Sequence, residues 1–385
     1  MRRFLGIVFL SLLAALPACA AMDTSAEHAL LMDGDSGQVL WQKDGFVPMP
    51  PASMSKLMTL ELLFQRLKDG RLKLDDTLPV SERAWRTQGS KMFVSLGSRV
   101  RVDDLIQGII VTSGNDACIV VAEGIGGTVE NFVAMMNTRA KQIGLMQSHF
   151  VNPDGLPDPP GQLMSAYDLA KLSRHLIRDY PGYYHYFSQK SFVWNNINQP
   201  NRDQVLGSLA GADGLKTGHT DLSGYGILAS ASRNGERLIL VLNGLRYPQY
   251  NNDYFPNIKR AQEAARILDI AFREFRRYPI YKGNQVIAQA KILGGAKDTV
   301  AVMVRDPLAV TMEVDSRTAM KVTLHADAGL HAPLVQGQRV GTITITAPDF
   351  PGLTVPVYAA EAVGRANILW RAWNWGVGLL THHKK

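Results

Sequence analysis

The chain has 385 residues, a formal net charge of +7 and a hydrophobic fraction of 46%. The composition is that of an ordinary globular protein, and the length is enough for two or three domains with hydrophobic cores. The nine histidines show no zinc-type spacing, so the sequence predicts no metal site. Nothing in it indicates a cofactor.

The first 20 residues have the pattern of a secretory signal peptide. A basic Arg2-Arg3 start precedes an apolar stretch over residues 4–16, and Ala18-Cys19-Ala20 offers a small-residue cleavage site. The alternative is a lipoprotein signal in which Cys19 is acylated. If cleavage follows Ala20, the mature chain keeps only Cys118, expected to be buried in a helix, and an internal disulfide is excluded. For an exported chain the positive charge favours anionic membrane or envelope polymers as partners, and not nucleic acid.

Two strands and then a helix open the mature chain. Residues 28–32 and 39–42 are expected to pair as strands. Pro50-Pro51 interrupts regular structure, and from Ser53 to Gly70 apolar residues recur every three or four positions, which predicts a helix. The string Ser53-Met54-Ser55-Lys56 stands at its beginning, and mostly helical segments are expected to follow to about residue 190.

Ser53 and Lys56 could form a nucleophile–base pair. Residues three apart lie on the same face of a helix, one turn apart. An apolar setting strips water from a lysine and disfavours its charged form, so the neutral amine of Lys56 can take the proton of the Ser53 hydroxyl. The alternative for an isolated Ser-x-x-Lys string is a helix cap beside a solvent-exposed lysine.

The string Ser113-Gly114-Asn115 forms a tight polar connection between the apolar segments 109–111 and 117–121. Gly114 is expected to adopt unusual backbone angles that let the two flanking side chains point the same way. Ser113 could then relay a proton to a leaving amine, and Asn115 could hydrogen-bond Lys56 and a substrate amide. The alternative is a plain polar turn between two helices.

The string Lys216-Thr217-Gly218 precedes two strand-like runs, 226–231 and 237–242, which Asn234-Gly235 joins as a hairpin. It is therefore expected to be extended. Gly218 would let a ligand approach the backbone, Lys216 supplies positive charge and Thr217 a hydroxyl for a carboxylate. Lys216 would also lower the pKa of Lys56. The alternative is an ordinary exposed strand lysine.

After residue 245 the pattern changes twice. A helix is expected near residues 258–276, and alternating runs then predict a small β-domain, at 285–292, 300–304, 321–325 and 340–346. Over residues 360–380, Val363 falls with tryptophans and leucines on one helical arc, and arginine and asparagine fall on another. This pattern predicts a helix lying in a membrane interface; the alternative is a helix packed on the β-domain.

In this order, the three strings resemble the motifs of the low-molecular-mass penicillin-binding proteins, which are serine-type D-alanyl-D-alanine carboxypeptidases. The likeness extends to the flanking residues and covers residues 25–380; the matching segments are 51–59, 111–117, 150–156, 201–202 and 213–220. It implies an α/β (α+β) catalytic domain of the penicillin-binding or serine β-lactamase type, whose sheet combines the first and last strands. The expected parts are a signal peptide (1–20), the catalytic domain (21–277), a small β-sandwich-like domain (278–358) and an amphipathic helix (359–385).

The resemblance also implies an acyl-enzyme mechanism. Ser53 attacks the carbonyl of the penultimate D-alanine in a peptidoglycan stem peptide that ends in D-Ala-D-Ala, and Lys56 takes its proton. The backbone N–H groups of Ser53 and His219 form the oxyanion hole. Ser113 and Lys216 help to pass a proton to the departing D-alanine, and water then hydrolyses the acyl-enzyme.

The resemblance assigns the terminal carboxylate to Thr217 and an arginine, for which Arg202 and Arg246 are the candidates. A further arginine that the family leads one to expect is absent from residues 247–252. β-Lactams are expected to mimic the substrate and trap Ser53. The implied location is the periplasm, with peripheral attachment to the inner membrane through residues 360–380.

Three other functions are compatible with parts of the sequence. A D,D-endopeptidase cuts a similar bond in cross-linked peptides. A class A-like β-lactamase needs a glutamate on a loop between the second and third strings, but Glu123 and Glu130 lie close to the second string and none lies between Thr138 and Lys216. A non-enzymatic envelope scaffold would be expected to have lost the nucleophile or its lysines, and all are present.

Overall fold

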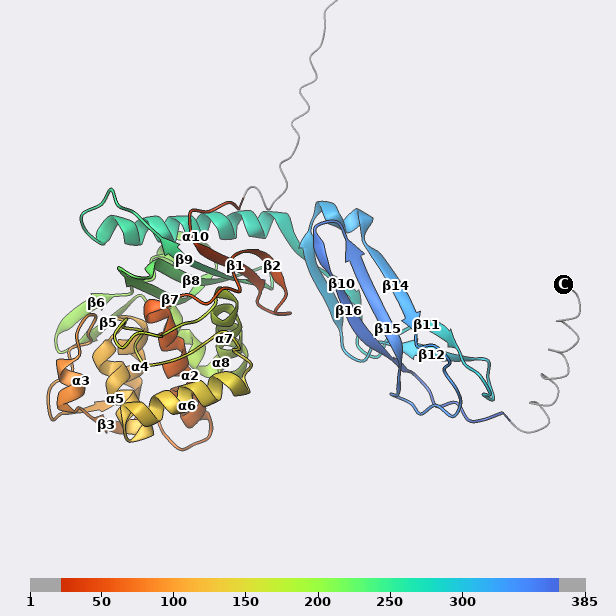
Figure 1. Cartoon of the computed structure of the whole chain (residues 1–385), viewed down its shortest axis with the longest axis horizontal. Helices are drawn as coiled ribbons and strands as arrows, with labels where there is room; N and C mark the ends of the chain where they lie inside the picture. The colour runs from red at the N-terminus through yellow and green to blue at the C-terminus, as the bar shows by residue number, and fades with distance from the viewer. Residues whose placement is uncertain (1–21, 367–385) are drawn as a thin grey trace, which may run out of the picture. The chain divides into compact units, whose positions relative to one another are not determined.

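The computed structural model describes residues 22–366, which form two compact units. The boundary between the units in the sequence falls between Arg273 and Glu274. The predicted signal peptide, Cys19 included, lies outside the described residues. So does most of the predicted C-terminal helix, residues 367–385. The first unit carries all three strings (Figure 1).

The first unit is built on a five-stranded antiparallel sheet with the order β2-β1-β9-β8-β7. Its strands are β1 (His28–Asp33), β2 (Val39–Lys43), β7 (Ala212–Thr220), β8 (Gly224–Arg233) and β9 (Glu236–Leu245). The predicted hairpin between β8 and β9 is confirmed: Asn234 and Gly235 both have positive φ, the conformation that a tight hairpin turn requires. β1, the first strand of this unit, pairs with β9, its last strand, as expected, and β7 lies at one edge of the sheet.

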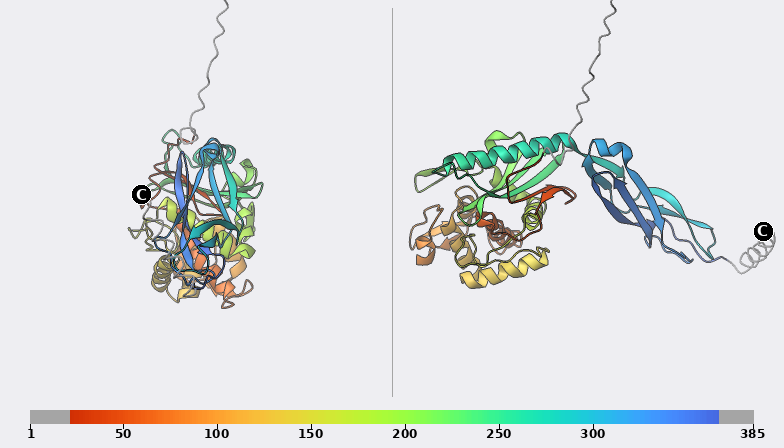
Figure 2. Two further views of the ribbon diagram at one scale, coloured as in Figure 1. Left: turned by 90° about the vertical axis from the view of Figure 1, so that its right-hand side faces the viewer. Right: turned by 45° about the horizontal axis from the view of Figure 1, so that its top comes forward.

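Helices cover both faces of this sheet (Figures 1 and 2). The long helix α10 (Tyr254–Glu274) runs along one face, and helices α2 to α8 lie on the opposite face. These are α2 (Lys56–Lys68), α3 (Glu82–Arg86), α4 (Val102–Ile110), α5 (Asn115–Gly126), α6 (Val129–Gln142), α7 (Ala166–Asp179) and α8 (Pro181–Tyr184), and the short α9 (Val205–Ser208) lies next to β7. Short 3₁₀ turns (Ala52–Ser55, His185–Ser188) and the strand pairs β3 (Thr77–Pro79) with β4 (Arg99–Arg101) and β5 (Ser191–Trp194) with β6 (Ile197–Pro200) complete the unit.

The helical layer surrounds α2, which is almost entirely buried. Apolar side chains of α2, α4, α5 and α7 form one continuous core with those of the sheet. Cys118 on α5 is buried in this core as expected, and burial raises the pKa of its thiol to about 12, so it stays protonated. Among the described residues, no single helix has the length and hydropathy to cross a membrane, although α5 and α6, bent by 84°, meet that criterion together.

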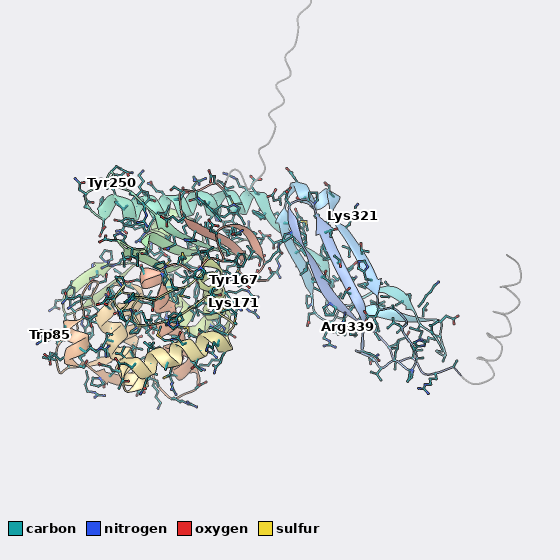
Figure 3. All side chains as sticks on the ribbon, in the orientation of Figure 1. Trp85, Tyr167, Lys171, Tyr250, Lys321 and Arg339 are labelled. Atoms are coloured by element: carbon teal, nitrogen blue, oxygen red, sulfur yellow. The ribbon has the colours of Figure 1, made fainter. Side chains whose placement is uncertain are left out.

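The second unit is all β apart from one 3₁₀ turn at Asp315–Ala319. It holds a five-stranded sheet, β11-β12-β16-β15-β14, and a pair, β10-β13. The strands are β10 (Phe275–Tyr281), β11 (Val286–Lys291), β12 (Thr299–Met303), β13 (Leu308–Glu313), β14 (Lys321–Ala326), β15 (Arg339–Ala347) and β16 (Phe350–Ala359). Lys321 and Arg339, labelled in Figure 3, mark the first residues of β14 and β15. The four predicted runs are strands, and the boundary expected after residue 277 falls inside β10.

The prediction that a helix begins at residue 359 or 360 is wrong for the described part of that segment. Val363 pairs with Leu334 through a β-bridge, and its side chain, 2% exposed, lies in the core of the β-domain. The Ala366 N–H donates to the Gly294 carbonyl. Residues 360–366 form bends and isolated bridges because their backbone groups bond the β-domain, which a helix would prevent.

Candidate active site

Ser53 and Lys56 lie together at the beginning of α2. Ser53 belongs to the 3₁₀ turn, and Lys56 is the first residue of the α-helix. The Lys56 Nζ is 2.6 Å from the Ser53 Oγ and 2.5 Å from the main-chain oxygen of Asp154. Lys56 is fully buried and Ser53 is partly exposed. The hydroxyl can therefore meet a substrate while the amine beside it is shielded from water.

Burial lowers the pKa of the Lys56 amine below its ordinary value of 10.5, and the charge of Arg202 acts in the same direction, against the opposite influence of Cys118 and Asp154. The charge repulsion expected between the two lysines is found at Lys216 instead of at Lys56. Burial, and then the charge of Lys56, lowers the pKa of Lys216 well below its ordinary value. The depressed pKa values favour neutral amines, which can accept and return protons.

Ser113 faces Lys216 across the site. The Lys216 Nζ lies 2.9 Å from the Ser113 Oγ, and both side chains are buried. The unusual backbone angle is found at Ser113, with φ of 59°, and not at Gly114, where φ is −57°. Glycine is needed at 114 for space, because a Cβ there would come within 2.9 Å of the Asp116 Oδ1 and 3.1 Å of the Met92 nitrogen.

Asn115 does not contact Lys56 as predicted. Its Nδ2 donates to the Gln88 carbonyl at 2.7 Å, while its buried Oδ1 has no hydrogen-bond partner among the described residues. The Gln88 carbonyl lies within reach because the Asn115 N–H donates to the carbonyl of nearby Ser90. The side-chain oxygen is thus a buried acceptor without a donor among the described residues.

Ser53 and Ser113 both line a cleft of about 190 Å³ beside the edge strand β7. It is lined by Ser53, Ser90, Ser113, Arg202, Thr217, Gly218, His219, Asp253, Asn257 and Arg260. Gly218 was expected to let a ligand approach the backbone. In the structure it is the chain itself that approaches, because a Cβ at this position would lie 2.9 Å from the Pro51 oxygen. The segment that carries Ser53 can thus lie directly against β7.

The two candidate arginines are placed differently. Arg202 lines the cleft together with Thr217. Arg246 does not line the cleft. Its guanidinium donates to the Glu27 carboxylate at 3.0 Å and to the carbonyls of Asp221 and Leu222. Of the two candidates, the structure therefore places Arg202, and not Arg246, at the cleft.

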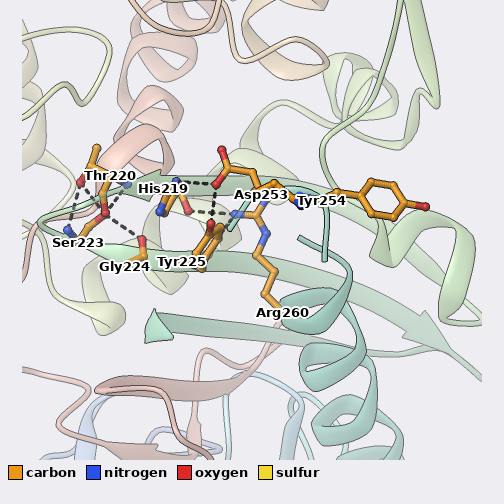
Figure 4. Close-up of polar contacts among 11 residues, drawn as sticks. His219, Thr220, Ser223, Gly224, Tyr225, Asp253, Tyr254 and Arg260 are labelled. Atoms are coloured by element: carbon orange, nitrogen blue, oxygen red, sulfur yellow. Dashed lines mark hydrogen bonds and ion pairs between the residues drawn. The ribbon is translucent and has the colours of Figure 1, made fainter. Parts of the chain in front are cut away.

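Sequence reasoning missed the residues that α10 and the segment before it bring to the cleft. The His219 ring stacks on Tyr225 with centroids 3.8 Å apart, and the Tyr225 hydroxyl donates to Asp253 at 2.5 Å (Figure 4). Burial lowers the pKa of His219, so the ring is neutral at neutral pH. Arg260, buried on α10, hydrogen-bonds β7. The one available signal was a basic residue within a buried, alanine-rich helix face.

No group of three or more histidine, cysteine, aspartate or glutamate side chains in residues 22–366 is arranged to hold a metal ion. The site has instead a hydroxyl next to a dehydrated amine, a second hydroxyl–lysine pair and a cationic cleft, which are the parts of a serine acyl-transfer site.

The family model for D-alanyl-D-alanine carboxypeptidases matches residues 15–245. The chain belongs to the S11 peptidase family. A second model, the C-terminal domain of penicillin-binding protein 5, matches residues 275–365, which correspond to the β-domain of this S11 peptidase. The motif resemblance and the fold expected from it are thereby confirmed.

Relatives match along nearly the whole chain. D-alanyl-D-alanine carboxypeptidase DacA of Haemophilus influenzae is 34% identical, with 91% of this chain and 88% of the relative covered. DacC of Escherichia coli is also 34% identical, with 92% and 88% covered. Penicillin-binding protein 5 from Haemophilus influenzae has a similar structure, with a TM-score of 0.79 and 33% identity over 89% of this chain and 98% of that one.

The catalytic unit also resembles penicillin-binding protein D2 from Listeria monocytogenes, which has been solved in ampicillin-bound and cefotaxime-bound forms. The TM-score is 0.58 at 27% identity, with 65% of this chain and 98% of that one covered. That relative therefore binds β-lactams on the same fold.

Proposed function

We propose that this S11 peptidase is a serine D,D-carboxypeptidase that removes the terminal D-alanine from peptidoglycan pentapeptide stems through a Ser53 acyl-enzyme. The observation that carries the proposal is the pairing of Ser53 with Lys56, 2.6 Å apart, at a cleft that is also lined by Ser113, the partner of Lys216. Family membership and the names of the relatives support the same activity.

In the acylation step, the Ser53 Oγ bonds to the carbonyl carbon of the penultimate D-alanine while its proton passes to the Lys56 Nζ. The charge that develops on the carbonyl oxygen is stabilised by the backbone N–H groups of Ser53 and His219, which donate to it. Thr217 and Arg202 hold the terminal carboxylate, which places the scissile bond over the nucleophile.

The tetrahedral intermediate then collapses, the C–N bond breaks, and D-alanine leaves. Its nitrogen takes a proton from the Ser113 hydroxyl, and the proton that Lys56 took from Ser53 replaces it, which returns Lys56 to its neutral form. Lys216, 2.9 Å from the Ser113 Oγ, holds that hydroxyl in place. In the second half of the reaction, neutral Lys56 takes a proton from water while the water oxygen bonds to the ester carbonyl carbon, and Lys56 then gives that proton to the Ser53 oxygen as the ester bond breaks.

β-Lactams are proposed to acylate Ser53 and to leave slowly. Glu130 is exposed and pairs with Arg83 at 2.8 Å, and neither Glu123 nor Glu130 lines the cleft. A glutamate able to activate water for fast β-lactam hydrolysis is therefore missing from the residues that line the site, which disfavours the β-lactamase alternative.

The test is to incubate the mature protein with a pentapeptide ending in D-Ala-D-Ala and, separately, with a purified cross-linked muropeptide dimer. A Ser53→Ala variant is the control. Release of D-alanine by the wild type alone supports the proposal. Cleavage of the dimer without release of D-alanine from the pentapeptide would favour the endopeptidase instead.

We also propose that the protein is exported to the periplasm and attaches peripherally to the inner membrane through residues 367–385. The support is the sequence pattern of this segment, in which Trp370, Trp373 and Trp375 stand among leucines and basic residues. A protein ending at Ala366 should move from the membrane pellet to the soluble fraction, while the full chain stays bound. If the shortened protein still pellets, the segment is not the anchor and an acylated Cys19 is favoured.

A further inference from the structure

Arg260 is a buried arginine that holds the backbone of the cleft. Its side chain, on the second turn of α10, is 3% exposed. The Nη1 donates to the carbonyl of Gly218 on β7 at 3.0 Å and to that of Gly226 on β8 at 3.2 Å. Figure 4 shows the guanidinium reaching from the helix to the sheet beside His219 and Tyr225.

The charge on this side chain is costly where it lies. Among residues 22–366, no carboxylate is within ion-pair distance of Arg260, and its Nε is buried without a hydrogen-bond partner. Burial lowers its pKa to about 10, against the attraction of Asp203, so it stays protonated at neutral pH. Its guanidinium carbon lies 5.9 Å from the centre of the Tyr225 ring, which compensates the charge only in part. A buried cation without a carboxylate partner destabilises a fold, so its presence next to the cleft indicates a role in function.

The carbonyl that Arg260 binds is one half of the peptide group between Gly218 and His219. In a planar trans peptide the C=O and the N–H point in opposite directions. A bond that fixes the Gly218 carbonyl therefore fixes the direction of the His219 N–H as well, pointing it away from the guanidinium. A cation on the carbonyl oxygen also withdraws electron density from the peptide, which makes that N–H a stronger donor.

We infer that Arg260 is a positioning residue for acyl transfer: it orients and polarises the Gly218–His219 peptide so that the His219 N–H donates to the oxyanion of the tetrahedral intermediate. The inference rests on the proposed function of the site and extends it to a residue outside the three strings. No bond to Arg260 forms or breaks during the reaction.

The competing role is direct recognition of the substrate carboxylate by Arg260. The geometry disfavours it, because Nη1 is engaged by two carbonyls and the side chain is almost fully buried, whereas the Arg202 side chain is exposed at the same cleft. The two roles differ in what they stabilise. Carboxylate recognition acts on the bound substrate, whereas an oriented N–H acts on the transition state.

The test compares Arg260→Gln and Arg260→Lys, with Arg266→Gln as a control on the same helix at an exposed ion pair with Glu263. Each is assayed on a peptide ending in D-Ala-D-Ala and on the same peptide with a terminal carboxamide. Losing an aligned oxyanion donor reduces kcat by about 100-fold or more. We expect that loss of kcat for Arg260→Gln on both peptides, with KM within about threefold of the wild-type value. The kcat of Arg260→Lys should be at least tenfold higher than that of Arg260→Gln, and Arg266→Gln should have wild-type rates.

A peptide boronic acid, which forms a tetrahedral anionic adduct with the nucleophilic serine, should lose affinity for Arg260→Gln in parallel with kcat. The inference is overturned if kcat stays within threefold of the wild type, if only KM for the carboxylate peptide rises, or if Arg260→Lys recovers nothing. If the wild type releases no D-alanine, the proposed function fails separately, and the inference is judged on the boronic acid and on the rate of penicillin acylation.

Discussion

Replacing Lys56 by methionine should slow acylation by about 100-fold or more and leave the fold intact. Methionine has nearly the volume of the lysine side chain, so the fully buried space is filled and the apolar packing of α2 is kept. What is lost is the amine 2.6 Å from the Ser53 hydroxyl. The substitution therefore separates the chemistry of the base from the packing of the helix.

The magnitudes of the two effects differ. Loss of a positioned general base costs about 10²- to 10⁴-fold in rate, which is about 3–5 kcal/mol of barrier. The main-chain oxygen of Asp154 loses its partner, which costs about 1–3 kcal/mol of stability, but the variant no longer buries an amine that prefers water. These contributions oppose each other, so we expect the free energy of unfolding to change by less than about 2 kcal/mol.

The assay is stopped-flow acylation by a fluorescent penicillin, with urea unfolding measured in parallel. Lys68→Met, the same change at an exposed position at the end of α2, is the control and should acylate as the wild type does. In the wild type, acylation should rise with pH and level off below 10.5, because burial lowers the pKa of Lys56 and the neutral amine is the active form. The reasoning is refuted if Lys56→Met acylates within fivefold of the wild type, or if the pH profile of the wild type rises only above 10.5.

Four further substitutions test the site and its support. Arg202→Ala should raise KM for D-alanine release by about 10-fold or more through loss of a charged hydrogen bond, whereas Arg246→Ala should leave KM within about twofold; equal effects of the two would contradict the placement of Arg202 at the cleft. Gly114→Ala should cost about 1–3 kcal/mol in urea unfolding because its Cβ meets the Asp116 carboxylate, and an unchanged midpoint would show that the turn can relax. Burial raises the pKa of Asp203 to about 6, so the wild type should lose stability on the order of 3 kcal/mol as the pH rises from about 4 to 6. In urea unfolding between pH 4 and 7, Asp203→Asn should not show this loss. If the free energies of unfolding of the two proteins change in parallel with pH, Asp203 is not the group responsible.

The sequence was sufficient for the parts of the molecule that are set by local pattern. The spacing within the first string brings Ser53 and Lys56 together at the start of α2, and the Asn234-Gly235 turn identifies the hairpin that supports β7. The meeting of Ser113 with Lys216, which joins segments 103 residues apart, followed from the resemblance. The pairing of the first strand with β9 followed from the resemblance. These features depend either on residues that are close in the chain or on the resemblance of the whole sequence to a family of known fold.

The features that were missed depend on contacts between distant segments. Asn115 bonds Gln88 because the 88–94 loop folds back over the start of α5, and Arg260 reaches β7 from a helix more than 40 residues further along. Val363 is drawn into the β-domain by its bridge to Leu334, which outweighs the helical pattern of the residues around it. Such pairings leave no periodic signal in a single sequence.

The central claim is that the hydroxyl of Ser53 is the nucleophile of a D-alanine-releasing enzyme. The most direct measurement titrates the mature protein with penicillin, locates and quantifies the adduct by peptide mass spectrometry, and records the remaining D-alanine release at each step. The account predicts one adduct per chain, on Ser53, and activity that falls in proportion to reach zero when Ser53 is fully modified. Activity that persists on fully modified protein, or an adduct on another residue, would contradict it.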